Sequence, residues 1–338
     1  KNILKQDSHE SYYVYELTMG NHTQTGLVGC CSIDDYFNNK IKKHELTRPD
    51  KEEDRKNHVR YSALNYEAVF LSYPQVTDID QLVNITKKES HLYDFISDDD
   101  IRHRLWAITN KEILQKIASL FRTKVPKIYI ADGHHRTAAG ALVGKELRDS
   151  RNGNLDDKKR DNYFMAVVFP DNQLKILDYN RVVKDFNGFT KNELIQGLKN
   201  KFDVVTCATQ YRPENLHTFG MYLEGQWYKL WSLPDSYDDS DPLGQLDVTI
   251  LSKNVLEPIF NIIDLRKDPR IDFVGGMRGL DELEKRVDSG EMKVAFSMYP
   301  VSMTQLINIS DNDLLMPPKV TWFEPKLRSG LFIHDLSD

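Results

Sequence analysis

The sequence predicts a mixed α+β fold (broadly, the α/β class) in two domains, and three observations lead to this prediction. Short apolar strands and amphipathic helices alternate along the 338 residues, as they do in layered α+β and α/β proteins. A strand, a turn and a helix follow one another over 127–148. The polar run 149–161, with a turn at Asn152-Gly153-Asn154, is typical of a linker. We therefore expect one domain over 1–150 and a second α+β domain over 162–338.

The first domain is predicted to begin with a β-hairpin, because tyrosines and aliphatic residues alternate with polar ones on both sides of Gly20-Asn21. Thr47, followed by Pro49 and acidic residues, is typical of a helix start. In chain order, the predicted elements are strands at 11–19 and 25–33, a helix at 49–61, a strand at 68–73, a helix at 109–121, a strand at 127–130 and a helix at 136–148.

The second domain also mixes hairpins with helices. The glycine-rich run 274–279 lacks both the Walker lysine–hydroxyl pair and the GxGxxG spacing, so we interpret it as a packing turn. The predicted elements are a hairpin of 163–169 and 174–183 across Asp171-Asn172, a helix at 191–198, a hairpin around Glu224-Gly225, helices at 246–256 and 280–287, and a strand at 294–299.

Composition excludes several classes of protein. The net charge is −6, which opposes nucleic acid as a partner because duplex binding needs a basic face. No apolar run reaches the roughly 18 residues of a membrane span, and the start has no secretory core. Cys30 and Cys31 are adjacent in a β-like stretch and cannot easily form a disulfide, so a reducing, cytoplasmic location is expected. The sequence has no zinc-binding CxxC or HExxH pattern. A homo-oligomer is compatible with all of this.

The most informative motif follows the central strand. Its six residues are Asp132, Gly133, His134, His135, Arg136 and Thr137. Glycine lets backbone approach a ligand closely, and the free N–H groups of a new helix favour an anion. The arginine adds a bidentate phosphate donor. The alternative is a polar loop whose histidines only cap the helix, but the strand–glycine–helix context favours a phosphate site. Adjacent histidines cannot easily share one metal ion, so we expect no metal held by protein ligands alone.

A second motif is the segment 42–48, in which Glu45 is surrounded by basic residues just before a helix start. Such a setting keeps a carboxylate ionised. An ionised carboxylate beside a phosphate site can take the proton of a hydroxyl as that hydroxyl attacks phosphorus. The alternative is a solvated run of charges, and the spacing alone favours neither interpretation.

The C-terminal tail is the third motif. Apolar side chains such as Trp322, Phe323 and Phe332 predict that it docks on the body of the protein, and its basic residues could then face an anion. The alternative is a docked edge strand whose lysines extend into solvent.

Taken together, the three motifs resemble a large, mostly uncharacterised bacterial and archaeal family related to the free-serine kinases, within the ParB/sulfiredoxin-like superfamily. The resemblance rests on the His-Glu-x-Thr-Arg segment at 44–48, the Asp-Gly-His-His-Arg turn at 132–136, and the Pro-Pro-Lys-x-Thr-Trp-Phe-Glu-Pro-Lys tail at 317–326. It implies a ParB/sulfiredoxin-like nucleotide-binding catalytic domain at the N-terminus. Members usually carry a further N-terminal segment, so we expect this chain to lack part of that family's length.

The resemblance also implies an activity. In the free-serine kinases the glutamate is the general base for the serine hydroxyl and the turn binds nucleotide phosphates, which would make Glu45 the base here. ADP or ATP would be the donor, with Mg²⁺, and L-serine or a similar hydroxy amino acid the acceptor. We expect five further residues to contact the substrate or support those that do: His44, Thr47, Arg48, Lys319 and Arg328.

This chain departs from its relatives in ways that matter. His134 replaces the reactive cysteine of sulfiredoxin, which excludes sulfinate repair by that thiol, and His135 replaces a hydroxyl residue of the kinases. The rival hypothesis is a ParB-like regulatory protein that binds or hydrolyses nucleotide and contacts DNA. Formation of O-phosphoserine would favour the kinase, and steeply salt-dependent binding to duplex DNA would favour the rival.

Overall fold

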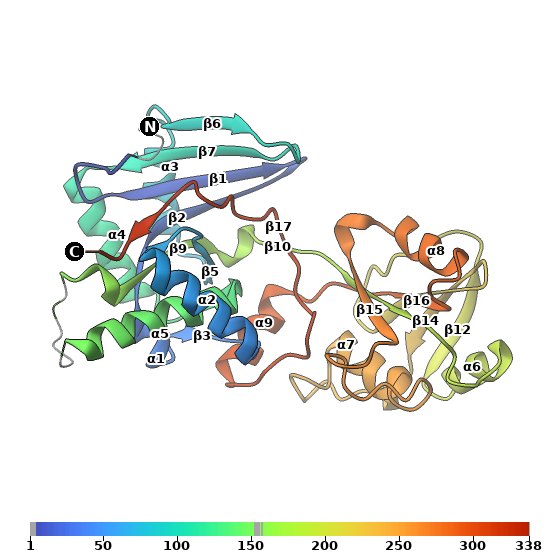
Figure 1. The fold of residues 1–338 in the computed structure, drawn as a ribbon. Coiled ribbons are helices and arrows are strands. Elements are labelled where there is room, and N and C mark those ends of the chain that lie inside the picture. The colour runs from blue at the N-terminus through green and yellow to red at the C-terminus, as the bar shows by residue number, and fades with distance from the viewer. Residues whose placement is uncertain (1–4, 152–155, 157, 338) are drawn as a thin grey trace. The chain divides into compact units, whose positions relative to one another are not determined.

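The computed structural model describes residues 5–151, 156 and 158–337, and the α+β prediction is confirmed. The chain forms two compact units, Lys1–Lys175 with Pro325–Asp338, and Ile176–Glu324 (Figure 1). This division differs from the expected boundaries at 150 and 162, because the strand at 163–170 completes the sheet of the first unit and the tail rejoins that unit. The turn predicted at 152–154 lies outside the described residues.

The first unit is built on an eight-stranded mixed sheet in the order β3-β8-β5-β9-β2-β1-β7-β6. The pairs β3/β8 and β5/β9 are parallel, and the other neighbours are antiparallel. The predicted hairpin is β1/β2. The strands are β1 (Tyr12–Met19), β2 (His22–Ser32), β3 (Ile41–Lys42), β5 (Val69–Tyr73), β6 (Tyr93–Ile96), β7 (Arg102–Ile108), β8 (Ile128–Asp132) and β9 (Tyr163–Pro170).

The helices of this unit are α1 (Ile33–Phe37), α2 (Pro49–Ser62), α3 (Thr77–Thr86), α4 (Lys111–Lys124) and α5 (His134–Ser150). Helix α5 packs closely because its inner residues are small. A Cβ added at Gly144 would lie 2.3 Å from the carbonyl oxygen of Asp161, and one at Gly140 would lie 3.0 Å from the Cβ of Phe164 in β9. This close packing fixes the start of α5 relative to β8. In the described part of the chain, no helix combines the length and hydrophobicity of a membrane span.

The second unit contains an antiparallel six-stranded sheet in the order β12-β14-β13-β16-β11-β15. Its strands are β11 (Tyr179–Val183), β12 (Phe202–Cys207), β13 (Thr218–Leu223), β14 (Gln226–Ser232), β15 (Ile271–Gly275) and β16 (Val294–Ser297). Its helices are α6 (Lys191–Leu198), α7 (Asp247–Leu251), α8 (Asp281–Asp288) and α9 (Met303–Asp311). A π-helical turn over Ser252–Leu256 continues α7. The helix predicted at 246–256 is therefore present, but it changes from α-helical to π-helical after Leu251.

The hairpin predicted across Asp171-Asn172 is wrong. The strand β9 pairs with β2 and β5 in the first unit, whereas β11 pairs with β15 and β16 in the second. The chain changes unit between these strands, through β10 (Lys175–Ile176), which pairs with β17 (Phe323–Glu324). Both strands are buried runs without polar alternation, so their sequences did not reveal their partners.

The C-terminal tail docks on the first unit, as its apolar residues predicted. The carbonyl of Pro325 accepts a hydrogen bond from Gln24 at 3.2 Å. Further along, β18 (His334–Asp335) pairs with β4 (Leu64–Asn65). Leu336 is buried beside Val59 of α2 and Val143 of α5. The tail is therefore part of the first unit's fold and crosses the region of the phosphate turn.

Candidate active site

The turn between β8 and α5 has the geometry of an anion site. Gly133 has φ +94°, a conformation that a side chain disfavours, and a Cβ there would lie 3.1 Å from the guanidinium of Arg136. The next residue, His134, already begins α5, two residues earlier than predicted. The hydroxyl of Thr137 is tied back to the carbonyl of Gly133 at 3.0 Å. Glycine thus opens the helix, and the threonine hydroxyl serves the turn rather than a ligand.

Arg136 is held at the mouth of this turn by acceptors from the loop before β5 and from the end of β8. One of its terminal nitrogens donates to Glu67 Oε2 at 3.3 Å and to the carbonyl of Ala68 at 3.2 Å, and the other lies 3.5 Å from Asp132 Oδ2. The side chain is 26% exposed. The guanidinium is therefore positioned in advance while one edge remains accessible to an incoming anion.

The two histidines join the turn to the segment that carries Glu45. The backbone N–H of His44 donates to His134 Nε2 at 3.5 Å, and that of Arg48 donates to His135 Nε2 at 3.0 Å. The rings of His44 and His134 also meet edge to face, with centroids 4.4 Å apart. Two predicted motifs separated by about ninety residues are therefore in direct contact. Each accepting Nε2 places the proton of the neutral ring on Nδ1, which becomes a donor.

Burial sets the charge of these imidazoles. Desolvation lowers the pKa of His44 to about 4, against smaller raising effects of Asp132 and a hydrogen bond to the backbone of Ile130. The pKa of His134 falls well below its ordinary value for the same reason, with further lowering by His44, His135 and Lys43 nearby. The pKa of half-buried His135 is also lowered, mainly by burial. At neutral pH the turn therefore offers neutral hydrogen-bond donors, and its fixed positive charge comes from Arg136.

Glu45 is half-buried between the two anchored residues His44 and Arg48. The side chains of the following residues serve the start of α2 instead of the turn. Thr47 donates its hydroxyl to Glu52 at 2.7 Å, and exposed Arg48 pairs with Asp50 at 2.8 Å. Thr47 was expected to start the helix, but Arg48 is its N-cap and makes no side-chain capping bond. This leaves Glu45 as the carboxylate whose position the anchored segment defines.

The tail adds two groups at the same place, both from the tail motif but neither among the residues expected to contact or support the substrate. Lys326 Nζ lies 3.4 Å from Asp132 Oδ2, and Ser329 donates its hydroxyl to Glu67 at 3.1 Å. Both carboxylates also hold the arginine of the turn. Membership of the tail motif was the only feature of the sequence that pointed to Lys326. Glu67 lies in a loop before β5 that contains no recognisable motif, so the sequence did not identify it.

The two tail residues that were selected behave differently. The backbone N–H of Arg328 donates to the buried hydroxyl of Tyr15 at 3.3 Å, so Arg328 is anchored on the first unit. Lys319 lies in the second unit, where its Nζ is 5.8 Å from the ring centroid of Tyr179. Only the part of the tail beyond residue 324 belongs to the unit that carries the turn.

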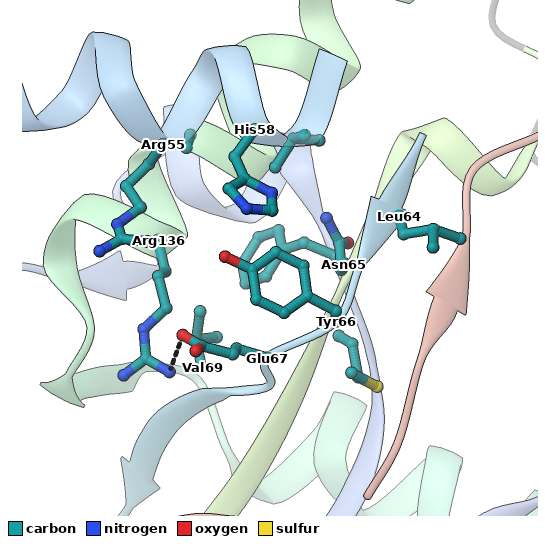
Figure 2. Close-up of a pocket in the computed structure, with 12 residues that line it drawn as sticks. Arg55, His58, Leu64, Asn65, Tyr66, Glu67, Val69 and Arg136 are labelled. Carbon is teal, nitrogen blue, oxygen red and sulfur yellow. Dashed lines mark hydrogen bonds and ion pairs between the residues drawn. The ribbon is translucent and has the colours of Figure 1, made fainter. Parts of the chain in front are cut away.

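A small pocket opens beside Arg136 (Figure 2). Arg55 and His58 reach it from α2, and the ring of Tyr66 lies 4.6 Å from that of His58. Glu67 faces the pocket and is joined there to Arg136 (Figure 2). The volume of the pocket is about 30 Å³, which leaves room for roughly two water molecules. The phosphate turn thus borders a small hollow whose mainly apolar wall carries several hydrogen-bond donors.

Comparison with known proteins places the chain in a family. It belongs to DUF1015, described as a protein of unknown function, whose family profile matches residues 1–249. No curated protein matches it. Among solved structures, it is similar to a free serine kinase in complex with AMP (13% identity, 88% of this chain and 86% of that one, TM-score 0.41).

Two further structures are similar at the same level. One is a conserved hypothetical protein from Pyrococcus furiosus (14% identity, 89% and 93% covered, TM-score 0.41). The other is SbnI with C-terminal truncation from Staphylococcus aureus (12% identity, 89% and 84% covered, TM-score 0.38). At such identities and TM-scores, none of these structures bears on the activity of this chain.

Proposed function

We propose that this protein is a small-molecule kinase that transfers a phosphoryl group from ADP or ATP to the hydroxyl of free L-serine or a similar hydroxy amino acid, giving O-phosphoserine. The observation that carries the proposal is the pair of amide-to-imidazole hydrogen bonds that hold the segment of Glu45 against the first turn of α5. A carboxylate beside an anion-binding helix start is the arrangement that phosphoryl transfer to an alcohol requires.

The phosphoryl group would bind at the start of α5. The free N–H groups of its first turn would donate to a bound anion, and Gly133 would let the phosphate approach the backbone. Arg136 and the Nδ1–H of His135 would stabilise the equatorial oxygens as charge spreads over them. These groups are positioned before substrate binds, so little reorganisation is needed during the reaction.

Glu45 would act on the acceptor. As the hydroxyl oxygen bonds to phosphorus, its proton passes to the Glu45 carboxylate, and the bond from phosphorus to the nucleotide oxygen breaks. The leaving group is AMP if ADP is the donor and ADP if ATP is the donor. Mg²⁺ would arrive on the nucleotide phosphates and neutralise their charge. Asp132, 38% exposed at the turn, is the kind of hard oxygen ligand that Mg²⁺ accepts.

The test is direct formation of O-phosphoserine. Purified protein is incubated with L-serine, Mg²⁺ and either ADP or ATP, and the product is detected by mass spectrometry. Glu45→Gln should lower turnover at least a hundredfold, since general-base catalysis contributes about 10²–10⁴, while the affinity for ADP measured by calorimetry stays within a few fold. Glu112→Gln, an exposed position in α4, is the matched control.

Two results would contradict the proposal at different points. If the wild-type protein forms no phosphorylated product with either nucleotide across a panel of serine, threonine and homoserine, the acceptor class is wrong. If Glu45→Gln retains wild-type turnover, the base is another group, and half-buried Glu67 beside Arg136 becomes the first alternative to replace.

A further inference from the structure

The C-terminal tail brings a second cation to the phosphate turn. Lys326 Nζ and one terminal nitrogen of Arg136 both bond to a single atom, Asp132 Oδ2, at 3.4 and 3.5 Å. Because both bonds end on the same oxygen, the two nitrogens cannot be further apart than the sum of these distances. Charge-assisted hydrogen bonds of about 2.8 Å to two oxygens of one phosphate span a gap of this size. The two cations are therefore close enough to hold one phosphate group between them.

The cations meet at the surface of the first unit, where a ligand can reach them. The side chain of Lys326 is 43% exposed, that of Asp132 38% and that of Arg136 26%. An anion therefore reaches both cations from solvent without entering a closed cavity. A lysine ammonium carries three N–H donors, so it can hold a carboxylate and an incoming anion at the same time.

The backbone of the tail is fixed on both sides of Lys326. The carbonyl just before it accepts a hydrogen bond from Gln24 at 3.2 Å. Three residues further on, Ser329 donates its hydroxyl to Glu67 at 3.1 Å, and Glu67 also holds Arg136. The tail thus places Lys326 at the turn before any ligand arrives, so less conformational freedom is lost when a ligand binds.

We propose that Lys326 is a phosphate-binding residue of this site, which holds the phosphate chain of the nucleotide donor together with Arg136 and the first turn of α5. The inference rests on the proposed function and assigns Lys326 to the donor instead of the amino acid. Asp132 directly precedes Gly133, where a phosphate can approach the backbone, so a cation on Asp132 lies beside the phosphates. During transfer, the ammonium group would stabilise the charge that develops on the leaving nucleotide oxygen.

The test combines calorimetry with hydrogen exchange on the full chain. The probes are ADP and inorganic pyrophosphate, each with Mg²⁺. Lys326→Met removes the ammonium group, keeps an aliphatic side chain and should weaken the binding of both probes at least tenfold. Unchanged affinity for both would overturn the proposal. Hydrogen exchange over 327–336 should match that of the wild type. Weaker binding together with faster exchange over this range would show that Lys326 only docks the tail, and would also overturn the proposal.

Three further variants control for charge and for folding. Lys326→Arg keeps a cation and should bind pyrophosphate within threefold of the wild type. Lys145→Met removes an exposed lysine of the same helix, paired with Asp149 at 2.8 Å. This lysine lies roughly 16 Å along α5 from its first turn, further than the screening length of about 8–10 Å, so ADP should bind as in the wild type. A tenfold loss in Lys145→Met would reduce the effect to net charge and overturn the proposal. If circular dichroism shows that Lys326→Met does not fold, Lys326→Gln replaces it.

These outcomes are distinguishable from those of the kinase assay. Weaker pyrophosphate binding by Lys326→Met, with no phosphoserine formed by the wild type, would refute the kinase and leave the phosphate-binding role standing. Phosphoserine formed by the wild type, with unchanged ADP affinity in Lys326→Met, would overturn the role of Lys326 alone. A raised KM for serine in that variant, with unchanged affinity for both probes, would place Lys326 on the carboxylate of the acceptor instead. A wild-type protein that binds neither probe would overturn both proposals.

Discussion

Acidification should destabilise the first unit through one buried imidazole. His44 is 2% exposed, packs edge to face on His134 and has a pKa of about 4 in the folded protein. A histidine in the unfolded chain has a pKa near 6.5. Below that value the unfolded chain takes up a proton that the folded chain excludes, so stability is complete above about pH 6.5 and is lost as the pH falls towards 4.

The size of the effect follows from the two pKa values. Between pH 7 and pH 5, a shift from an ordinary 6.5 to about 4 removes about 2 kcal/mol of unfolding free energy. Other groups titrate in the same range, above all His134, whose pKa is also strongly lowered by burial. A difference between two proteins is therefore more informative than one pH profile. His44→Gln removes the titrating group at this position and retains an amide N–H donor.

The assay is urea unfolding followed by tryptophan fluorescence and circular dichroism at pH 7 and pH 5. His44→Gln should be less stable than the wild type at pH 7, but its unfolding free energy should fall by about 2 kcal/mol less on acidification. His9→Gln, at an exposed position, should keep the wild-type pH dependence. Identical pH dependence in His44→Gln and the wild type would show that His44 titrates normally and would refute the reasoning from its burial.

Three substitutions test the packing that positions the site. Gly133→Ala should lower the free energy of unfolding by about 1–2 kcal/mol because of the positive φ at this position. It should also weaken nucleotide binding, because the new Cβ would lie 3.1 Å from the Arg136 side chain. The control Gly20→Ala, at φ +58° with no atom within 4 Å, should lower stability without affecting binding. Gly144→Ala should destabilise by more than about 2 kcal/mol, since a carbonyl lies 2.3 Å from the new Cβ, whereas Gly197→Ala meets only a contact at 3.5 Å and should be neutral or stabilising. Leu336→Ala should lower the free energy of unfolding by about 2–3 kcal/mol, because this tail residue is 7% exposed in a small apolar cluster. Unfolding free energies measured in urea test all three substitutions. An unchanged stability of Leu336→Ala would show that the tail does not dock on the first unit.

Local patterns were sufficient where the chain's own neighbours determine the structure. The β-hairpin around Gly20, the helix after Pro49 and the strand–turn–helix unit at 128–150 were all predicted within a few residues. In each case a glycine or proline requires a particular backbone angle and the apolar spacing identifies the buried face. These signals act over a handful of residues, so they can be seen without knowledge of the tertiary structure.

Contacts between distant segments could not be predicted in this way. The strand β9 reads as an unbroken apolar run, YFMAVVFP, which fits a hairpin with its successor as well as insertion between β2 and β5. Glu67 and Lys326 meet Asp132 and Arg136 only because three separated segments converge. The resemblance of the motifs brought Glu45 and the turn together in the prediction, but it did not reveal that imidazoles make the connection.

The histidines of the turn therefore have a structural use in addition to the phosphate binding that we predict for them. Each imidazole accepts a backbone N–H through Nε2, and burial keeps both rings neutral at neutral pH. Around Arg136, the two carboxylates of Asp132 and Glu67 balance the charges of the guanidinium and Lys326. A cluster that is neutral overall gains little from long-range attraction of a polyanion. Selectivity at this turn must then come from the geometry of its N–H donors, which is why the φ of Gly133 and the anchoring of 44–48 matter more to the proposed chemistry than the number of basic residues in the motif.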